Sequence, residues 1–155
     1  MNHSTTDEPT DLAILCVDDE QVILTSVTAQ LKAHFGRRYL YETALNGDEA
    51  LEVLDELRED NVKTLIILSD WLMPGMRGDE LLVRAHQRFP HTIKLILTGQ
   101  ADAEGIERAR REANLYACLQ KPWSREQLIS TIERAIEALD QEGERSQAHE
   151  TGAPR

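Results

Sequence analysis

The sequence predicts an α/β fold in which a parallel sheet of five strands is covered by helices on both faces. Two observations support this prediction. Short, continuous aliphatic runs of the kind that form strands buried on both faces recur along the chain. Between them lie segments with apolar residues at helical spacing, so strands and helices alternate five times. Such alternation implies right-handed crossovers, which bring the carboxyl ends of all strands to one edge of the sheet.

The strands are recognised by aliphatic runs that end in loop residues. Four consecutive aliphatic residues, 65–68, lead to Asp70, and the run at residues 12–17 leads to Asp18. Residues 39–44 alternate in character and predict an edge strand instead. The predicted strands are residues 12–17, 39–44, 65–70, 92–97 and 115–119.

The helices are recognised by apolar residues that repeat every three or four positions. Asn46 with Glu49, and Ser124 with Gln127, fit capping boxes at the starts of the second and the last helix. The helix at residues 102–113 has a thin apolar stripe and is expected to be the least firmly anchored. The stretches whose apolar positions predict these helices are residues 23–35, 50–57, 79–88, 102–113 and 128–139.

One domain is expected, at residues 11–140 of the 155. Residues 1–10 are polar and predict a disordered leader. Residues 141–155 are polar with Gly and Ser, and predict a disordered tail or the start of a linker. No apolar run approaches the roughly 20 residues that span a bilayer, and the N-terminus lacks the features of a signal peptide. A cytoplasmic location without membrane contact is therefore expected.

The net charge of −11 argues against direct binding to nucleic acid or to an anionic membrane. Two interpretations of the acidic excess stay open, namely a solvated surface and a set of carboxylates that lines a cation site. Cys16 and Cys118 both lie in apolar runs, which predicts buried, reduced thiols rather than metal ligands.

Polar groups follow four of the predicted strands at the edge where the strand carboxyl ends meet. They are Asp18, Asp19, Asp70, Thr98 and Lys121. Oxygen ligands without a nearby His or Cys favour a hard cation, and Mg²⁺ is the usual choice when phosphate oxygens complete its shell. A carboxylate beside that cation can attack a phosphoryl group, while a lysine, a hydroxyl and the backbone at Gly99 stabilise the charge in transit.

At these positions the sequence closely resembles the receiver domain of two-component response regulators. The matching motifs are Val17-Asp18-Asp19-Glu20, Asp70 with Met73-Pro74-Gly75 and Gly78, Leu97-Thr98-Gly99, and Lys121-Pro122-Trp123. The resemblance covers about residues 11–140. It implies a flavodoxin-like (βα)5 fold with strand order 2-1-3-4-5.

The resemblance also implies the roles of the site residues. Asp70 is the expected phosphoacceptor, and the expected Mg²⁺ ligands are Asp19, Asp70 and the backbone carbonyl of Leu72, with Asp18 acting through water. Lys121 is expected to pair with the phosphoryl oxygens and Thr98 to act as the switch hydroxyl. A cis peptide bond is expected before Pro122. The donor would be a phosphohistidine on a sensor histidine kinase or a phosphotransfer protein.

Two positions depart from the family. Many receivers have an aromatic residue where this chain has Cys118. Tyr116 lies on the same strand face, so it either takes over part of that role or packs at a strand edge. At Leu72 some receivers have a polar residue that orients the attacking water, so a fairly long-lived phosphorylated Asp70 is expected here.

The leading interpretation is therefore a phosphoacceptor switch, not an enzyme, that alters the surface formed by the fourth helix, the fifth strand and the fifth helix. A homodimer through that surface, a separate output protein, or an output domain such as a cyclic-dinucleotide enzyme are the readouts that the family suggests. Two rivals are an aspartate-nucleophile phosphatase of the haloacid-dehalogenase type and a receiver used only for docking. The phosphatase needs a second acid where this chain has Leu72.

Overall fold

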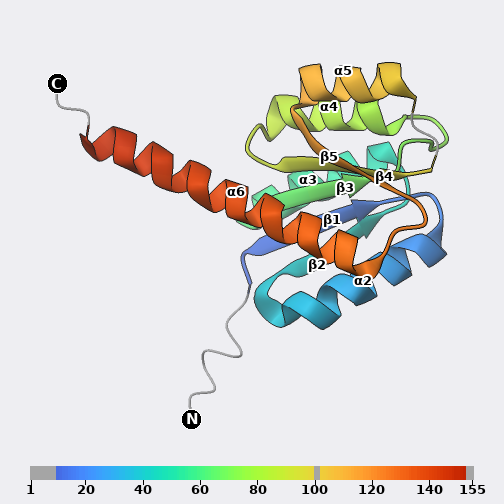
Figure 1. The fold of residues 1–155 in the computed structure, drawn as a ribbon, viewed down its shortest axis with the longest axis horizontal. Helices are drawn as coiled ribbons and strands as arrows, with labels where there is room; N and C mark the ends of the chain where they lie inside the picture. The colour runs from blue at the N-terminus through green and yellow to red at the C-terminus, as the bar shows by residue number, and fades with distance from the viewer. Residues whose placement is uncertain (1–9, 100–101, 153–155) are drawn as a thin grey trace, which may run out of the picture.

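The computed structural model describes residues 10–99 and 102–152, which form a five-stranded parallel sheet with helices on both faces (Figure 1). The order of the strands is β2-β1-β3-β4-β5, so the predicted flavodoxin-like architecture is confirmed. The strands begin and end within two residues of the predicted positions. They are β1 (Leu12–Val17), β2 (Leu40–Ala44), β3 (Lys63–Ser69), β4 (Ile93–Thr98) and β5 (Leu115–Gln120).

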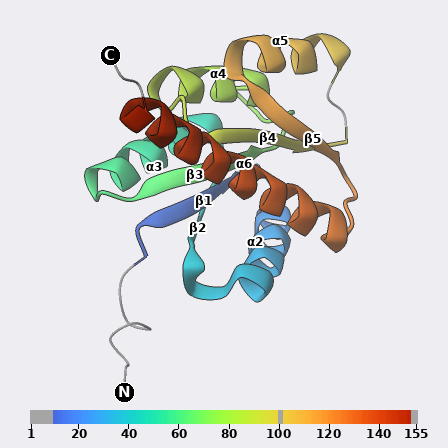
Figure 2. The same cartoon turned by 60° about the vertical axis from the view of Figure 1, so that its left-hand side comes forward.

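The helices divide between the two faces of the sheet, and Figures 1 and 2 show the two layers from different sides. Helices α3, α4 and α5 cover one face, and α2 and α6 cover the other. The fourth and fifth helices of the family therefore correspond to α5 and α6. The elements are α2 (Gln21–Phe35), the short 3-10 helix η1 (Gly36–Arg38), α3 (Gly47–Glu59), α4 (Gly78–Arg88), α5 (Ala103–Ala113) and α6 (Arg125–Gly152).

Alternating residues of each central strand enter different cores, as expected for strands that are buried on both faces. On β1, Leu15 and Val17 pack with α3 and α4, whereas Ile14 and Cys16 pack with α2 and α6. This alternation fixes the position of the strand ends, because a shift by one residue would exchange the two sets. Asp18 and Asp70 are thereby held at the carboxyl edge of the sheet.

The predicted helix caps are confirmed. The side chain of Asn46 accepts a hydrogen bond from the backbone N–H of Glu49 at 2.8 Å, and the Glu49 carboxylate accepts one from the N–H of Leu45. Ser124 and Gln127 form the reciprocal pair at the start of α6, with distances of 3.0 and 3.4 Å. These bonds satisfy N–H groups that have no partner within the helix.

Helix α6 is longer than the sequence pattern predicted. Disorder was expected from Gln141 onward, but the helix continues to Gly152 and projects past the edge of the sheet (Figure 1). The apolar stripe ends at Leu139, which is why the pattern predicted a stop there. The segment after it lacks an apolar stripe but contains three Glu and two Gln, residues that have a good helix propensity.

Helix α5 is anchored by small side chains, as its thin apolar stripe predicted. Its buried residues are Gly105, Ala109 and Ala113, and Ile106 is only half-buried. The Asp102 carboxylate caps this helix by accepting a hydrogen bond from the N–H of Gly105 at 2.6 Å. Few large apolar groups would have to leave the core if α5 moved.

The prediction for the two cysteines is right for Cys16 and wrong for Cys118. Cys16 is buried, and burial raises the pKa of its thiol to about 12. Cys118 is exposed, because α5 leaves the face of β5 that carries Tyr116 and Cys118 uncovered. Both thiols are free.

Among the described residues, no helix is long and apolar enough to cross a membrane.

Candidate functional site

Three carboxylates meet at the carboxyl edge of the sheet. Backbone hydrogen bonds tie together the strand ends that carry them, from the N–H of Asp70 to the carbonyl of Val17 at 2.9 Å and from the N–H of Asp18 to Ala44 at 3.1 Å. Asp18, Asp19 and Asp70 each have a carboxylate oxygen within 4.8 Å of the others. Asp18 and Asp70 are buried, whereas Asp19 is exposed to solvent.

Lys121 lies between two of these carboxylates. Its Nζ atom is 2.8 Å from Oδ2 of Asp18 and 3.4 Å from Oδ2 of Asp70. Burial alone would lower the pKa of Lys121, but the hydrogen bonds and negative charges of the two aspartates outweigh it and raise the pKa. The ammonium group therefore stays charged and partly neutralises the acidic cluster.

The negative charge around the Asp70 carboxylate is only partly neutralised by its surroundings. Burial and the charge of Asp18 raise the pKa of Asp70. Lys121, a 2.7 Å hydrogen bond from the backbone N–H of Trp71 and a hydrogen bond with Thr98 lower it, without cancelling the increase. Three carboxylates thus face one ammonium group, and a further cation would relieve their repulsion. The all-oxygen donor set fits a hard divalent ion such as Mg²⁺.

Thr98 and Gly99 end the neighbouring strand. Thr98 is buried, and its carbonyl accepts a hydrogen bond from the N–H of Lys121 at 3.2 Å, which holds the ends of β4 and β5 together. A Cβ atom added at Gly99 would lie 3.6 Å from the Lys121 carbonyl oxygen, an ordinary contact. The protein surroundings therefore leave room for a side chain at this position.

The loop after Asp70 folds back closely onto the strand end. The N–H of Gly78 donates a hydrogen bond to the carbonyl of Trp71 at 2.8 Å, and a Cβ atom at Gly78 would lie 2.2 Å from the backbone oxygen of Asp70. Glycine is therefore required at residue 78. Leu72 lies in this loop with 57% of its surface exposed. The role of its carbonyl as a metal ligand stays a prediction.

Trp71 connects the loop to α5. Its side chain is 3% exposed, and its ring fills the space beside Gly105. A Cβ atom at Gly105 would lie 1.6 Å from Cη2 of the indole. The guanidinium carbon of Arg77 lies 5.0 Å from the centre of the ring. The residue after Asp70 is therefore in direct contact with α5.

An ion-pair network also connects α5 to the region after Asp70. This network was not predicted from the sequence. Asp79, whose side chain is fully buried, accepts hydrogen bonds from Arg77 and Arg108 at 3.2 Å each. Arg108 lies on α5, among the many charged residues of that helix. No local pattern reveals its partner, because Asp79 lies 29 positions earlier in the chain. Through Arg108, α5 is joined to the start of α4.

The remaining predicted residues lie on β5 and just after it. Tyr116 is 43% exposed and Cys118 is exposed, on the uncovered face. Burial raises the pKa of the Cys118 thiol, while the charge of Arg110 lowers it less. The peptide bond between Lys121 and Pro122 is cis, as the resemblance implied. Whether Tyr116 or Cys118 takes part in switching stays a prediction.

A family model and two relatives of known name match most of this chain. The family model of the response regulator receiver domain matches residues 14–133. The hydrogenase transcriptional regulatory protein HoxA of Cupriavidus necator is 32% identical over 131 residues, which are 84% of this chain and 25% of HoxA. The chemotaxis protein CheY of Pseudomonas aeruginosa is 30% identical over 132 residues, which are 83% of this chain and 99% of CheY.

A solved structure agrees with these relatives. The signal receiver domain of an HD domain-containing protein from Pseudomonas fluorescens Pf-5 aligns with a TM-score of 0.75 and 29% identity, over 86% of this chain and 99% of that one. The chain thus spans a quarter of the length of HoxA but nearly all of CheY.

Proposed function

The chain belongs to the response regulator receiver domain family, and from this premise we propose that Asp70 accepts the phosphoryl group in a phosphorelay. One observation carries the proposal. Asp70 is the carboxylate on which Asp18, Lys121 and the Trp71 N–H converge, at the end of a strand that is otherwise apolar. Such convergence costs folding free energy, and costly clusters of this kind are typical of functional sites.

The donor in this proposal is a phosphohistidine on a sensor histidine kinase or a phosphotransfer protein. A carboxylate oxygen of Asp70 forms a bond to phosphorus while the phosphorus–nitrogen bond of the donor breaks, and the imidazole keeps that electron pair. Lys121 then pairs with the oxygens of the transferred group, and the Thr98 hydroxyl donates a hydrogen bond to one of them. The protein accepts a group in this way and turns over no separate substrate.

The carboxylates of Asp18, Asp19 and Asp70, with the carbonyl of Leu72, would hold Mg²⁺ in this proposal. The fit rests on their chemistry, since hard cations select oxygen ligands and these carboxylates cluster within 4.8 Å. When bound, Mg²⁺ would offset the charge of the phosphoryl oxygens.

Phosphorylation is proposed to change the face formed by α5, β5 and α6. Thr98 ends the strand that leads into α5, so its movement toward a phosphoryl group would pull on a helix anchored by small residues. The output is a separate protein, a homodimer through this face, or a domain of a longer regulator. The last fits the relation to HoxA, of which this chain spans 25%. A cytoplasmic location, where such kinases present their phosphohistidine, belongs to the same proposal.

Acetyl phosphate provides the direct test. We expect incubation of the chain with acetyl phosphate and Mg²⁺ to add one phosphoryl group, and reductive trapping followed by peptide mapping to locate it at Asp70. Chelating the metal with EDTA should reduce the adduct at least about tenfold, because the acidic cluster then repels the incoming oxygens.

Intact mass spectrometry measures the adduct, and two results would contradict the proposal. One is the absence of an adduct at saturating acetyl phosphate, and the other is an adduct at a different residue. Steady turnover of a generic phosphate ester would point instead to the aspartate-nucleophile phosphatase.

Leu72 is expected to prolong the phosphorylated state, because an exposed leucine cannot orient a water molecule for attack. Leu72→Asn should therefore speed the loss of the phosphoryl group several-fold, which decay of the adduct after removal of acetyl phosphate would measure. Val22→Asn provides a control, since Val22 is another exposed aliphatic residue, on α2. Equal decay in Leu72→Asn and wild type would show that residue 72 does not limit hydrolysis.

A further inference from the structure

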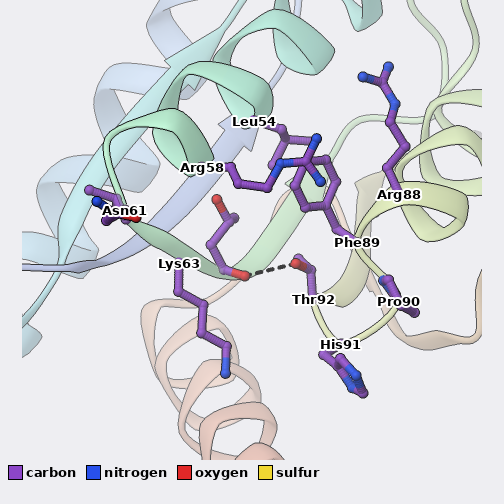
Figure 3. A pocket seen from close by; sticks show the side chains of 11 residues that line it. Leu54, Arg58, Asn61, Lys63, Arg88, Phe89, Pro90, His91 and Thr92 are labelled. Atoms are coloured by element: carbon purple, nitrogen blue, oxygen red, sulfur yellow. Dashed lines mark hydrogen bonds between the residues drawn. The ribbon is translucent and has the colours of Figure 1, made fainter.

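A hollow lies at the edge of the sheet opposite to the edge that carries Asp70, and Figure 3 shows it from close by. It encloses about 380 Å³ between the ends of α3 and α4 and the beginnings of β3 and β4. Because β3 has seven residues, this hollow is separated from Asp70 by about 20 Å, the length of the strand. It is therefore distinct from the phosphoacceptor site.

One wall of the hollow is held rigidly by buried hydrogen bonds. The ammonium group of Lys94, a residue that is 1% exposed, donates to the carbonyls of Phe89 at 2.9 Å and Pro90 at 3.4 Å. The hydroxyl of Thr92 donates to the carbonyl of Thr64 at 2.8 Å, as Figure 3 shows. These bonds fix the loop that carries the Phe89 ring. The hollow is thus pre-formed, and its volume lies in the range of about 300–1,000 Å³ that small-molecule sites occupy.

The charge of the lining is opposite to that of the whole chain. Four lining residues are basic, and the described residues that line the hollow include no acid. The basic ones are Arg58, Lys63, Arg88 and His91. The nearest paired carboxylate, Asp55, is shared by Arg88 at 2.6 Å and Arg58 at 3.5 Å. One carboxylate cannot neutralise two guanidinium groups and Lys63, so the lining itself carries a net positive charge in a chain of net charge −11.

An aromatic surface adjoins these cations. The guanidinium carbon of Arg58 lies 4.6 Å from the centre of the Phe89 ring, and Figure 3 shows the two groups stacked. Leu54, Val62 and Pro90 add apolar surface to the lining. A planar ring can stack against such a surface, and an attached anion can pair with a guanidinium group at the same time.

We propose that this hollow binds a small planar anion, an aromatic ring that carries a phosphate or a carboxylate group. The ring packs against the apolar side chains of the lining, and the anionic group pairs with the guanidinium group of Arg58. An acidic protein segment would need a longer groove than this pocket of about 380 Å³ provides.

The test is an NMR titration of backbone amides without Mg²⁺, which keeps phosphate away from the acidic cluster. The probes are AMP and benzoate, which distinguish the phosphate and the carboxylate forms of the ligand, with adenosine and inorganic phosphate as comparators. We expect at least one of AMP and benzoate to shift the amides of residues 58–64 and 88–92 saturably. Its Kd should be at least about tenfold lower than that of either comparator.

Exposed residues supply the variants, so that folding is preserved. Arg58→Gln should raise the Kd about tenfold, whereas Arg134→Gln, an exposed arginine on α6, should leave it unchanged. Three results would overturn the proposal. They are no binding of either probe, equally tight binding of inorganic phosphate alone, and binding of an Asp- and Glu-rich peptide in place of both probes.

Discussion

Replacing Asp70 with Asn is expected to abolish the phosphoryl adduct formed from acetyl phosphate. The Asn amide has nearly the same shape as the carboxylate but lacks the anionic oxygen that attacks phosphorus. Intact mass spectrometry should show a loss of at least about a hundredfold in adduct, within the range that removal of a covalent nucleophile produces. Asp48→Asn is the matched control, because Asp48 is an exposed aspartate in the first turn of α3, and it should be phosphorylated like wild type.

The stability of Asp70→Asn to urea shows whether this variant is folded. Burial and Asp18 raise the pKa of Asp70, so the folded chain binds a proton at this residue more tightly than the unfolded chain does. The resulting stability is present at low pH and is lost as the pH rises from the ordinary value through the raised pKa. At neutral pH without Mg²⁺, Asp70→Asn should therefore be at least as stable as wild type to urea. An adduct that persists in this folded variant would refute Asp70 as the acceptor.

The second large effect is expected at Gly105, where substitution by Ala should destabilise the fold by about 1–3 kcal/mol, the usual cost of overpacking a core. The reason is the Trp71 ring, since the added Cβ atom would lie 1.6 Å from its Cη2 atom. At an exposed helix position the same change would stabilise the protein by about 1 kcal/mol. The sign of the change in the free energy of unfolding therefore shows whether Trp71 packs against α5.

Urea unfolding followed by circular dichroism measures this change. Trp71→Leu frees the space beside Gly105, so adding Gly105→Ala in that background should cost at least about 1 kcal/mol less than in wild type. Glu107→Ala, an exposed change on the same helix, should be close to neutral. Stabilisation by Gly105→Ala in wild type would rule out the contact between the loop and the helix.

The sequence predicted those parts of the fold that depend on local pattern. Buried strands are visible as aliphatic runs, and a carboxylate at the end of such a run, as at Asp70, is conspicuous because the strand itself does not need it. Once the strands are known to be parallel, the convergence of Asp18, Thr98 and Lys121 follows from topology. Local capping boxes at Asn46 and Ser124 were likewise readable.

The rest depended on contacts between distant segments. Asp79 finds Arg108 on another helix, and the buried Lys94 finds the carbonyls of Phe89 and Pro90 in a loop, so neither partner can be recognised from spacing. The exposure of Cys118 was missed because it is decided by how far α5 extends over β5, which a strand pattern does not contain. The hollow beside Phe89 likewise forms only where the ends of α3 and α4 meet the beginnings of β3 and β4.

The length of α6 has a mechanical consequence. The helix has 28 residues, and Leu139 makes the last apolar contact with the core among the side chains that the structure describes. The part beyond it extends about 20 Å at 1.5 Å per residue, so a tilt of about 10° within the domain would displace the far end by about 3 Å. A small rearrangement at the α5-β5-α6 face would thus be amplified, as by a lever arm, for anything attached to the end of this helix.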